Sequence, residues 1–360
     1  MYKVKEIVLS NKEIRWMVLD EENKIVVPVM KYIKYKDYLK KAPNTLKTYC
    51  YHLKIYWDFL EKSECSHLVI SLDKLSRFIH WLRTGMLTIG NIYTLPIRSE
   101  KTINQMVHCI VDYYDYLYRN HLIGVDVKKF VLTEIYRGSK FKPFLDHIQR
   151  GKQKTFPKSL LKLREEKNRL QVIDQDMFKE ICNFCSHKRN RLILFIMFET
   201  GIRAHELLNL QLNDFELSQR RILIRKSKTK AGENRYVYFS EKLLDFFQNY
   251  VLMYHTEEIM TDYVFFSLSG LNKEHKLSYS ALQKMIQRLS QNSGIAFSAH
   301  SLRHSCATNL HEKGLEVSII QKILGHAHVQ TTIGMYIHPT DKMIRRSWEQ
   351  AVRKGANTYE

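Results

Sequence analysis

The first residues of the chain alternate apolar and polar positions in short runs. These runs cover residues 4–9, 15–19 and 25–29, and turn-forming residues separate them. Alternation with a period of two between turn signals is typical of paired β-strands. We therefore expect an N-terminal β-ribbon over residues 1–28.

From Pro43 to about Tyr136 the apolar positions recur every three or four residues, and Asn44 is placed to cap the first helix. Such spacing puts the apolar side chains of a helix on one face, which must be buried. Three stripes show it: Leu46, Tyr49, Leu53, Tyr56 and Leu60; Leu75, Phe78, Ile79 and Leu82; Ile103, Val107, Ile110, Tyr114 and Leu117. We predict a helical bundle within residues 29–137.

The apolar periodicity weakens between residues 138 and 170. Ten lysines or arginines and three acidic residues give this stretch a formal charge of +7. We predict a basic interdomain linker, which is either a solvated loop or a segment that lies along a phosphate backbone.

Helical signals return at Val172, with Asp174 placed as a cap and Gly201 as a stop. Two β-like runs follow at residues 221–225 and 235–239, joined by a turn rich in lysine and glycine, and helices resume at about Ser278. Residues 171–353 are predicted to form one mostly helical domain with a small sheet, followed by a tail at 354–360. The expected fold class is mainly α with a small β-sheet.

Length and charge add two constraints. A chain of 360 residues favours two domains. Its 57 lysines and arginines against 37 acidic residues give a formal charge of +20, which favours nucleic acid as partner over a membrane surface.

The first residues lack the apolar stretch of a signal peptide, and the longest apolar run, residues 192–198, is too short to span a bilayer. We expect a cytoplasmic protein.

Six scattered cysteines favour free thiols over a disulfide framework. Cys182 and Cys185 form a CxxC pattern with His187 nearby, but a zinc site needs four ligands and no second pair follows. We expect no metal site.

Three motifs in the second half carry reactive groups. Arg203 follows the predicted helix stop and begins the next helix, where a guanidinium can bind two phosphate oxygens or pair with Glu206. His300 and Arg303 share one helical face and combine a group that exchanges protons with a permanent cation. Each motif alone is also typical of ordinary helix surface.

The third motif places His326 directly after a helix-ending glycine and ten residues before Tyr336. Only the combination is specific. The order Arg203, His300, Arg303, His326 and Tyr336 resembles the active-site signature of the tyrosine recombinase (phage integrase) family over residues 171–352. The segment before the tyrosine is one residue longer than is usual in the family, and Gly334 offers a place to absorb it.

The resemblance implies a catalytic lysine in a β-hairpin between Arg203 and the HxxR motif. Lys228 is the first candidate there and Lys230 the second. The first half is similar to the family's helical core-binding domain, so the resemblance implies a core-binding domain followed by a catalytic domain of the α+β type. Together the two would close around double-stranded DNA.

The resemblance also implies a mechanism. Tyr336 attacks a DNA phosphodiester and forms a 3′-phosphotyrosine, while Arg203 and Arg303 clamp the non-bridging oxygens. Lys228 protonates the 5′-hydroxyl, His300 moves a proton or holds the phosphate, and His326 donates a hydrogen bond. We expect no metal, nucleotide or other cofactor, since the cationic side chains supply the charge and the phosphotyrosyl bond conserves the energy.

The implied function is site-specific integration or excision of a mobile element, in the manner of a transposase A-type enzyme. We expect a homo-oligomer, a tetramer, on DNA, with accessory recombination proteins as possible further partners. The helix expected at residues 341–353 could pack in cis or on a neighbouring protomer. The alternatives are a type IB topoisomerase and a non-catalytic DNA-binding accessory factor for excision.

Overall fold

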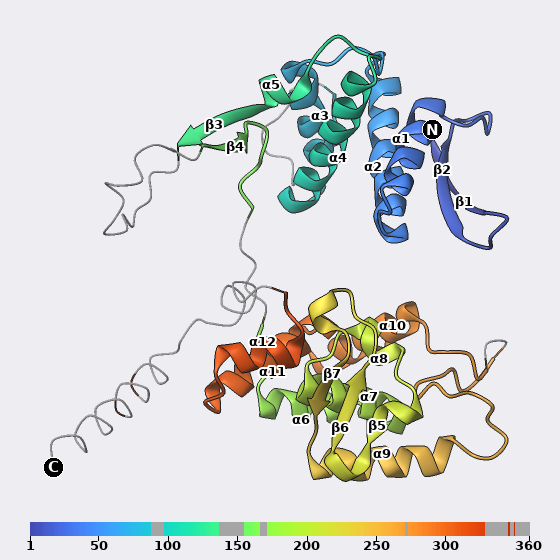
Figure 1. Cartoon of the computed structure of the whole chain (residues 1–360), viewed down its shortest axis with the longest axis vertical. Helices are drawn as coiled ribbons and strands as arrows, with labels where there is room; N and C mark the ends of the chain where they lie inside the picture. Colours follow the sequence, from blue (N-terminus) through green and yellow to red (C-terminus); the bar gives the residue numbers. More distant parts are fainter. Residues whose placement is uncertain are drawn as a thin grey trace. The chain divides into compact units, whose positions relative to one another are not determined.

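The computed structural model of the chain describes residues 1–87, 97–136, 155–165, 171–270 and 273–327, together with Arg345 and Glu349. The chain divides into two compact units, Met1–Lys167 and Asn168–Glu360 (Figure 1). None of the helices in the described ranges is long and apolar enough to cross a membrane.

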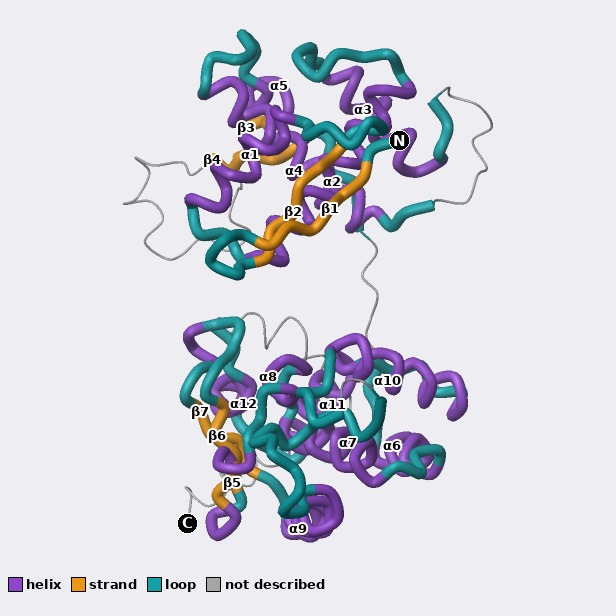
Figure 2. Tube along the Cα trace, turned by 90° about the vertical axis from the view of Figure 1, so that its right-hand side faces the viewer, coloured by secondary structure: helices purple, strands orange, loops and turns teal. Residues whose placement is uncertain are grey.

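The N-terminal unit begins with an antiparallel hairpin of β1 (Lys3–Val8) and β2 (Ile14–Leu19). Strand β2 packs against helix α2 (Figure 2). The predicted third run is wrong, because helix α1 (Val27–Tyr38) begins there and only Ile25 bridges back to β2. The buried positions of α1 follow helical spacing, which overrides the short alternation at its start.

The three predicted apolar stripes are confirmed as α2 (Pro43–Lys62), α3 (Leu72–Thr84) and α4 (Glu100–Arg119). The predicted cap at Asn44 is wrong: Ala42 is the N-cap and α2 begins at Pro43, whose fixed φ suits a first helical turn. A short helix, α5 (Val127–Val131), follows α4.

Aromatic side chains dominate the core of this unit. The buried aromatic residues of this core are Tyr32, Tyr56, Trp57, Phe59, Phe78, Trp81, Tyr113 and Tyr114. Many of them contact each other edge to face, as the quadrupole of aromatic rings favours. The hydroxyls of Tyr56 and Tyr114 lie 2.7 Å apart and satisfy one another in the core.

Part of the segment expected as a linker is ordered as a hairpin. Strand β3 (Leu132–Tyr136), at the end of the stretch expected to be helical, pairs antiparallel with β4 (Thr155–Ser159). Leu161 then joins the core of the N-terminal unit, and the Asn104 side chain hydrogen-bonds both the N–H and the carbonyl of Leu163. Residues 155–165 therefore pack with the N-terminal helices.

The C-terminal unit is mostly helical and contains a three-stranded antiparallel sheet, ordered β5-β6-β7. Its helices and strands are α6 (Gln175–Asn183), α7 (Lys188–Thr200), α8 (Ala204–Leu208), β5 (Phe215–Glu216), β6 (Arg221–Ile224), β7 (Arg235–Tyr238), α9 (Glu241–Tyr254), α10 (Tyr279–Ser293), α11 (Ala299–Glu312) and α12 (Val317–Leu324). The predicted cap at Asp174, both predicted strands and the fold class are confirmed.

Helix α9 was not predicted, although Ser240 caps it and its buried Leu243, Phe247 and Tyr250 follow helical spacing. The buried helix α7 packs against α9 and α11. Gly201 ends α7 with a left-handed φ of 61°, and an added Cβ there would lie 2.6 Å from a methyl carbon of Leu324. This close approach brings the end of α7 against the end of α12.

Candidate active site

Three arginines converge on the C-terminus of α12. The last carbonyls of a helix lack intrahelical partners and carry a partial negative charge, so they attract cationic donors. The contacts are Arg235 Nε to the Ile323 carbonyl (2.8 Å), Arg303 Nη2 to Leu324 (2.7 Å) and Arg203 Nη2 to Gly325 (3.0 Å). Consecutive carbonyls thus fix guanidinium groups that come from three different parts of the unit.

Arg203 forms the N-cap of α8, as its position after the glycine stop predicted. Its backbone N–H donates to Glu206 Oε2 at 2.9 Å, and its Nη1 donates to Glu206 Oε1 at 2.8 Å and to Ser227 Oγ at 2.9 Å. The carboxylate therefore holds both the backbone and the guanidinium of Arg203. Arg203 therefore pairs with Glu206 and at the same time lies in the arginine cluster.

Glu206 is a buried carboxylate whose side chain is fully shielded from solvent. Burial alone would raise its pKa, but hydrogen bonds and charge from Arg235, with Ser227 and the Arg203 backbone, outweigh burial and bring the pKa to about 2. Glu206 is therefore ionised at neutral pH and compensates part of the positive charge of the cluster.

Arg303 lies on α11 and is 3% exposed. Its Nη1 donates to the Gly201 carbonyl and its Nη2 to the Leu324 carbonyl, each at 2.7 Å. Both acceptors lie at helix C-termini, those of α7 and α12. The guanidinium plane is thus fixed by the two helix ends that the close contact at Gly201 brings together.

Arg235, at the start of β7, was not among the residues singled out in the sequence. Its Nη2 pairs with Glu206 Oε2 at 2.7 Å, and its Nη1 also contacts the Gly232 carbonyl. The side chain is 8% exposed. A lone arginine at a strand end gave no sequence signal, because its partners are distant in the chain.

The two histidines of the signature lie beside these arginines. His326 follows the helix-ending Gly325 and is 8% exposed, and Gln321 hydrogen-bonds its backbone N–H and carbonyl. Burial, then the charges of Arg303 and Arg203, lower the pKa of His326 from 6.5 to about 4, and His300 contributes to the same shift. His326 is therefore neutral at neutral pH, whereas His300 lies exposed near the start of α11.

Glycines permit the close packing of this region. Gly325 has a φ of 67°, and a Cβ on it would lie 2.6 Å from the Gly232 Cα. A Cβ on Gly232 would in turn lie 2.5 Å from Ser227 Oγ. The turn of the β6–β7 connection therefore rests directly on the end of α12, backbone against backbone.

The β6–β7 connection carries both lysine candidates. Ser227 donates to Glu206 Oε1 at 2.6 Å, and Thr229 donates to the Gly325 carbonyl at 3.1 Å. Lys228 and Lys230 alternate with these two residues and are exposed. The connection is thus anchored to the arginine cluster by its small hydroxyl residues, and its lysines lie on its solvent-exposed side.

Comparisons with known proteins establish the family. The model of the phage integrase family matches residues 171–343. Transposase A from transposon Tn554 of Staphylococcus aureus is 34% identical to this chain, over 98% of each sequence. The chain belongs to the tyrosine recombinase (phage integrase) family. Members of this family cleave and rejoin DNA, so the chain is a site-specific recombinase.

A further sequence relative and a solved structure are also similar to this recombinase. Tyrosine recombinase XerA of Pyrococcus furiosus is 33% identical over 55% of the recombinase chain and 63% of its own length. A solved structure of the Tn1549 transposon integrase with a circular intermediate DNA is 15% identical and has a TM-score of 0.62. It covers 90% of the recombinase and 98% of that chain, which shows a shared fold.

The structure brings four of the signature residues into one region of the recombinase: Arg203, His300, Arg303 and His326. Lys228 lies on the connection anchored to them. Tyr336 and most of the helix expected at 341–353 lie outside the described residues. The assignment of Tyr336 as nucleophile therefore rests on the sequence signature.

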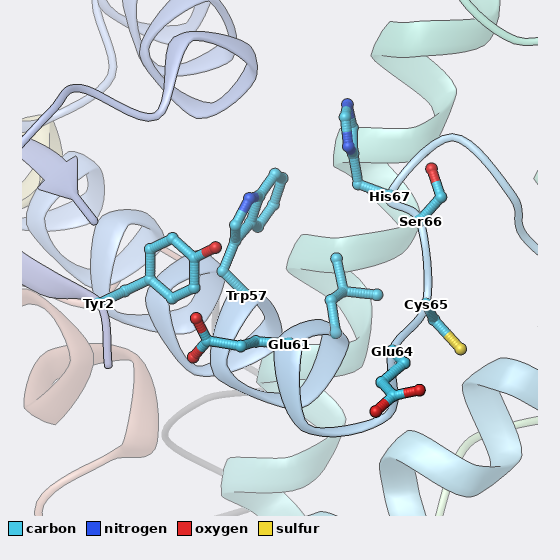
Figure 3. Close-up of a pocket in the computed structure, with 8 residues that line it drawn as sticks. Tyr2, Trp57, Glu61, Glu64, Cys65, Ser66 and His67 are labelled. Atoms are coloured by element: carbon cyan, nitrogen blue, oxygen red, sulfur yellow. The ribbon is translucent and has the colours of Figure 1, made fainter. Parts of the chain in front are cut away.

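Other candidate features lie apart from this cluster. All six cysteines are free thiols, and the buried Cys185 thiol donates to the His187 carbonyl at 3.8 Å. In the described ranges no three histidines, cysteines or carboxylates gather as a metal site. The N-terminal unit has an open pocket of about 320 Å³ beside Tyr2, Trp57 and His67 (Figure 3). The pocket contains none of the signature residues.

Proposed function

We propose that this recombinase integrates or excises a mobile DNA element, cutting each strand through a 3′-phosphotyrosine at Tyr336. The observation that carries the proposal is the convergence of Arg203, Arg303 and His326 on one helix end. The 34% sequence identity with a transposase A, which extends over 98% of the chain, supports the mobile-element role.

Arg203 and Arg303 clamp the scissile phosphate. Phosphodiesters resist attack because the phosphate is already anionic, and fixed cations offset the charge that develops at the non-bridging oxygens. Backbone carbonyls and Glu206 orient both guanidinium groups before DNA binds. The clamp is therefore preorganised, which lowers the reorganisation needed in the transition state.

The remaining proposed groups carry out the attack and the proton transfers. The Tyr336 phenol oxygen forms a bond to phosphorus as the bond to the 5′-oxygen breaks, and Lys228 supplies the proton that this oxygen gains. Neutral His326 donates a hydrogen bond to the phosphate, and His300 holds the phosphate or accepts the phenol proton. Attack by a new 5′-hydroxyl reverses these steps. The phosphotyrosyl bond conserves the energy, so the proposal includes no metal or nucleotide cofactor.

Double-stranded DNA is the proposed partner, which the formal charge of +20 and the DNA-bound Tn1549 integrase support. We propose a homotetramer on DNA, with accessory recombination proteins, acting in the cytoplasm. Residues 29–137 together with the β3–β4 hairpin would form the core-binding domain, and residues 171–353 the catalytic domain. The basic segment between them would lie along the phosphate backbone.

A nicked suicide substrate tests the chemistry, because loss of a short product strand traps the covalent complex. We expect wild type to form a protein–DNA adduct and Tyr336→Phe to bind the same DNA without forming one. Binding by wild type without any adduct would favour the accessory-factor alternative. Relaxation of supercoiled plasmid without strand exchange would favour a topoisomerase.

A substrate with sulfur at the bridging 5′ position distinguishes the two lysines. A thiolate leaves without a proton donor, so it bypasses the general acid. We expect Lys228→Ala to slow cleavage of the oxygen substrate by roughly 10²–10⁴-fold, with most of the rate restored by sulfur. Lys230→Ala is the matched control. If only the Lys230 variant shows the defect and the rescue, Lys230 is the general acid.

A further inference from the structure

Arg235 donates to protein acceptors through all three nitrogens of its guanidinium. Its guanidinium donates to both oxygens of Glu206, at 2.7 Å through Nη2 and 3.2 Å through Nη1, and to the Ile323 carbonyl at 2.8 Å through Nε. These contacts join the first residue of β7 to α8 and to the end of α12. Its side chain is 8% exposed, so it is enclosed by protein.

We propose that Arg235 is a positioning residue that sets the geometry of the phosphate clamp through Glu206 and the C-terminus of α12. The proposal rests on the proposed function of this site. It assigns Arg235 no contact with DNA or with the reacting atoms.

The route from Arg235 to the clamp is short. The same Glu206 oxygen, Oε1, accepts from Arg235 Nη1 and from Arg203 Nη1. Loss of Arg235 leaves the buried carboxylate with Arg203 as its cationic partner, and this strengthens the ion pair that Arg203 Nη1 already makes with Glu206 at 2.8 Å. The strengthened ion pair competes with the phosphate for Arg203.

The second route runs through α12. Arg235 Nε satisfies the Ile323 carbonyl, and the next two carbonyls hold Arg303 and Arg203. The end of this helix therefore keeps its position only while its three orphan acceptors are paired. His326 follows directly, so a shift of the helix end displaces both clamp arginines and the histidine together.

A planar fork is needed for this role. Arginine can donate to a carboxylate with two nitrogens and to a carbonyl with a third, whereas a lysine ammonium is a point charge without that planar geometry. Arg235→Lys therefore keeps the positive charge beside Glu206 and loses the link to α12. Arg235→Met removes both the charge and the link.

The sheet offers a matched control. Arg221 pairs with Glu216 at the far end of strands β6 and β7, where Arg221 lies opposite Tyr238 and Arg235 opposite Ile224. Both are arginine–glutamate pairs whose arginine lies on a strand of this sheet, but the side chains of Arg221 and Glu216 are 23% and 35% exposed. Arg221→Met removes a comparable ion pair at a site remote from the clamp.

The experiment is single-turnover cleavage of the nicked substrate at saturating protein, together with the Kd for the same DNA. We expect Arg235→Met to lower the first-order rate constant by about 100-fold, the scale of a small misplacement of catalytic groups. Arg235→Lys should lower it by about tenfold. Final adduct amplitude should stay near that of wild type, Kd should change by less than about threefold, and Arg221→Met should retain the wild-type rate constant.

Amplitude separates positioning from stability. A residue that only stabilises the fold lowers the fraction of active protein and leaves the rate constant of that fraction unchanged, and this result would overturn the proposal. If Arg235→Met does not fold, Arg235→Lys carries the test, and an unchanged rate constant in that variant also overturns it.

The sulfur-bridged substrate sharpens the assignment. Arg235 acts on the clamp and not on leaving-group protonation, so we expect sulfur to leave its defect in place while it rescues the variant of the acid lysine. Rescue of Arg235→Lys by sulfur would overturn the clamp assignment. If wild type itself forms no adduct, the proposed function fails, and that outcome is distinguishable from all of these.

Discussion

The two units of the recombinase shield their charged groups to different degrees. The N-terminal unit encloses tyrosine hydroxyls, such as the Tyr56–Tyr114 pair at 2.7 Å, within a core of aromatic rings. The C-terminal unit encloses a full carboxylate, Glu206, with the guanidinium of Arg235 beside it. The N-terminal unit also buries charges such as Lys36, but the ionic partner of Lys36, Asp112, has a side chain that is 26% exposed. In the Glu206–Arg235 pair both side chains are shielded, at 0% and 8% exposed.

The difference affects how much stability is lost when one partner of a buried polar contact is removed. A neutral hydrogen bond in a core contributes modestly to stability, and removal of one partner costs about 1–3 kcal/mol because the other is left unsatisfied. A buried ion pair is weak support for stability as a whole, but removal of one partner strands the other in a medium that cannot solvate it. Burying several arginines around one helix end is thus a costly arrangement, and it fits the proposed phosphate clamp because it fixes cations before the anion arrives.

The largest expected effect comes from breaking the ionic arrangement. Glu206→Gln leaves Arg235 buried without its counter-charge, and we expect the C-terminal unit to lose about 3–5 kcal/mol of unfolding free energy. Unfolding in urea, monitored by hydrogen exchange with mass spectrometry, would assign the loss of unfolding free energy to that unit.

The exposed pair supplies the control for this variant. Glu216→Gln should change the unfolding free energy by about 0–1 kcal/mol. Equal effects at Glu206 and Glu216 would remove the contrast between a buried ionic cluster and an ordinary surface pair.

A second effect depends on pH. His326 has a folded pKa of about 4 against 6.5 for the ordinary group. Between these values the unfolded chain binds more protons than the folded chain, so this contribution is fully present above pH 6.5 and is lost as pH falls toward 4. Glu206 acts at lower pH, because its contribution is lost only between 4.5 and about 2.

We therefore expect the unfolding free energy of wild type to fall more steeply between pH 7 and pH 5 than that of His326→Gln. Urea titrations of both proteins at the two pH values measure this. The other buried histidines contribute equally to both proteins, so the difference isolates His326. Parallel pH dependence would mean that His326 is not held neutral by the cluster.

The neutral core should respond less strongly than the ionic cluster. Tyr56→Phe removes one buried hydroxyl, keeps the ring and leaves the Tyr114 hydroxyl without this partner, so the N-terminal unit should lose about 1–3 kcal/mol. The fluorescence of Trp16, Trp57 and Trp81, which all lie in this unit, follows its unfolding in urea. A loss as large as that of Glu206→Gln would show that the two units do not differ in this respect.

Local sequence patterns predicted much of the fold. Apolar spacing located α2, α3 and α4, and the glycines that end α7 and α12 were recognisable as stops. The errors arose where two signals competed. The start of α1 alternates like a strand, and the β3–β4 hairpin pairs residues about twenty positions apart across a basic segment with weak periodicity.

The sequence by itself supplied the proposed reactive groups of this recombinase, because the order Arg203, His300, Arg303, His326 and Tyr336 can be recognised along the chain without its fold. The tertiary structure decided how the described members of this set are held. Arg203 reaches the carbonyl of a residue 122 positions away, and Arg303 reaches one 102 positions away. Backbone carbonyls belong to every residue type and leave no mark in a sequence, so only folding reveals which of them orient the clamp, and with them the part played by Glu206 and Arg235.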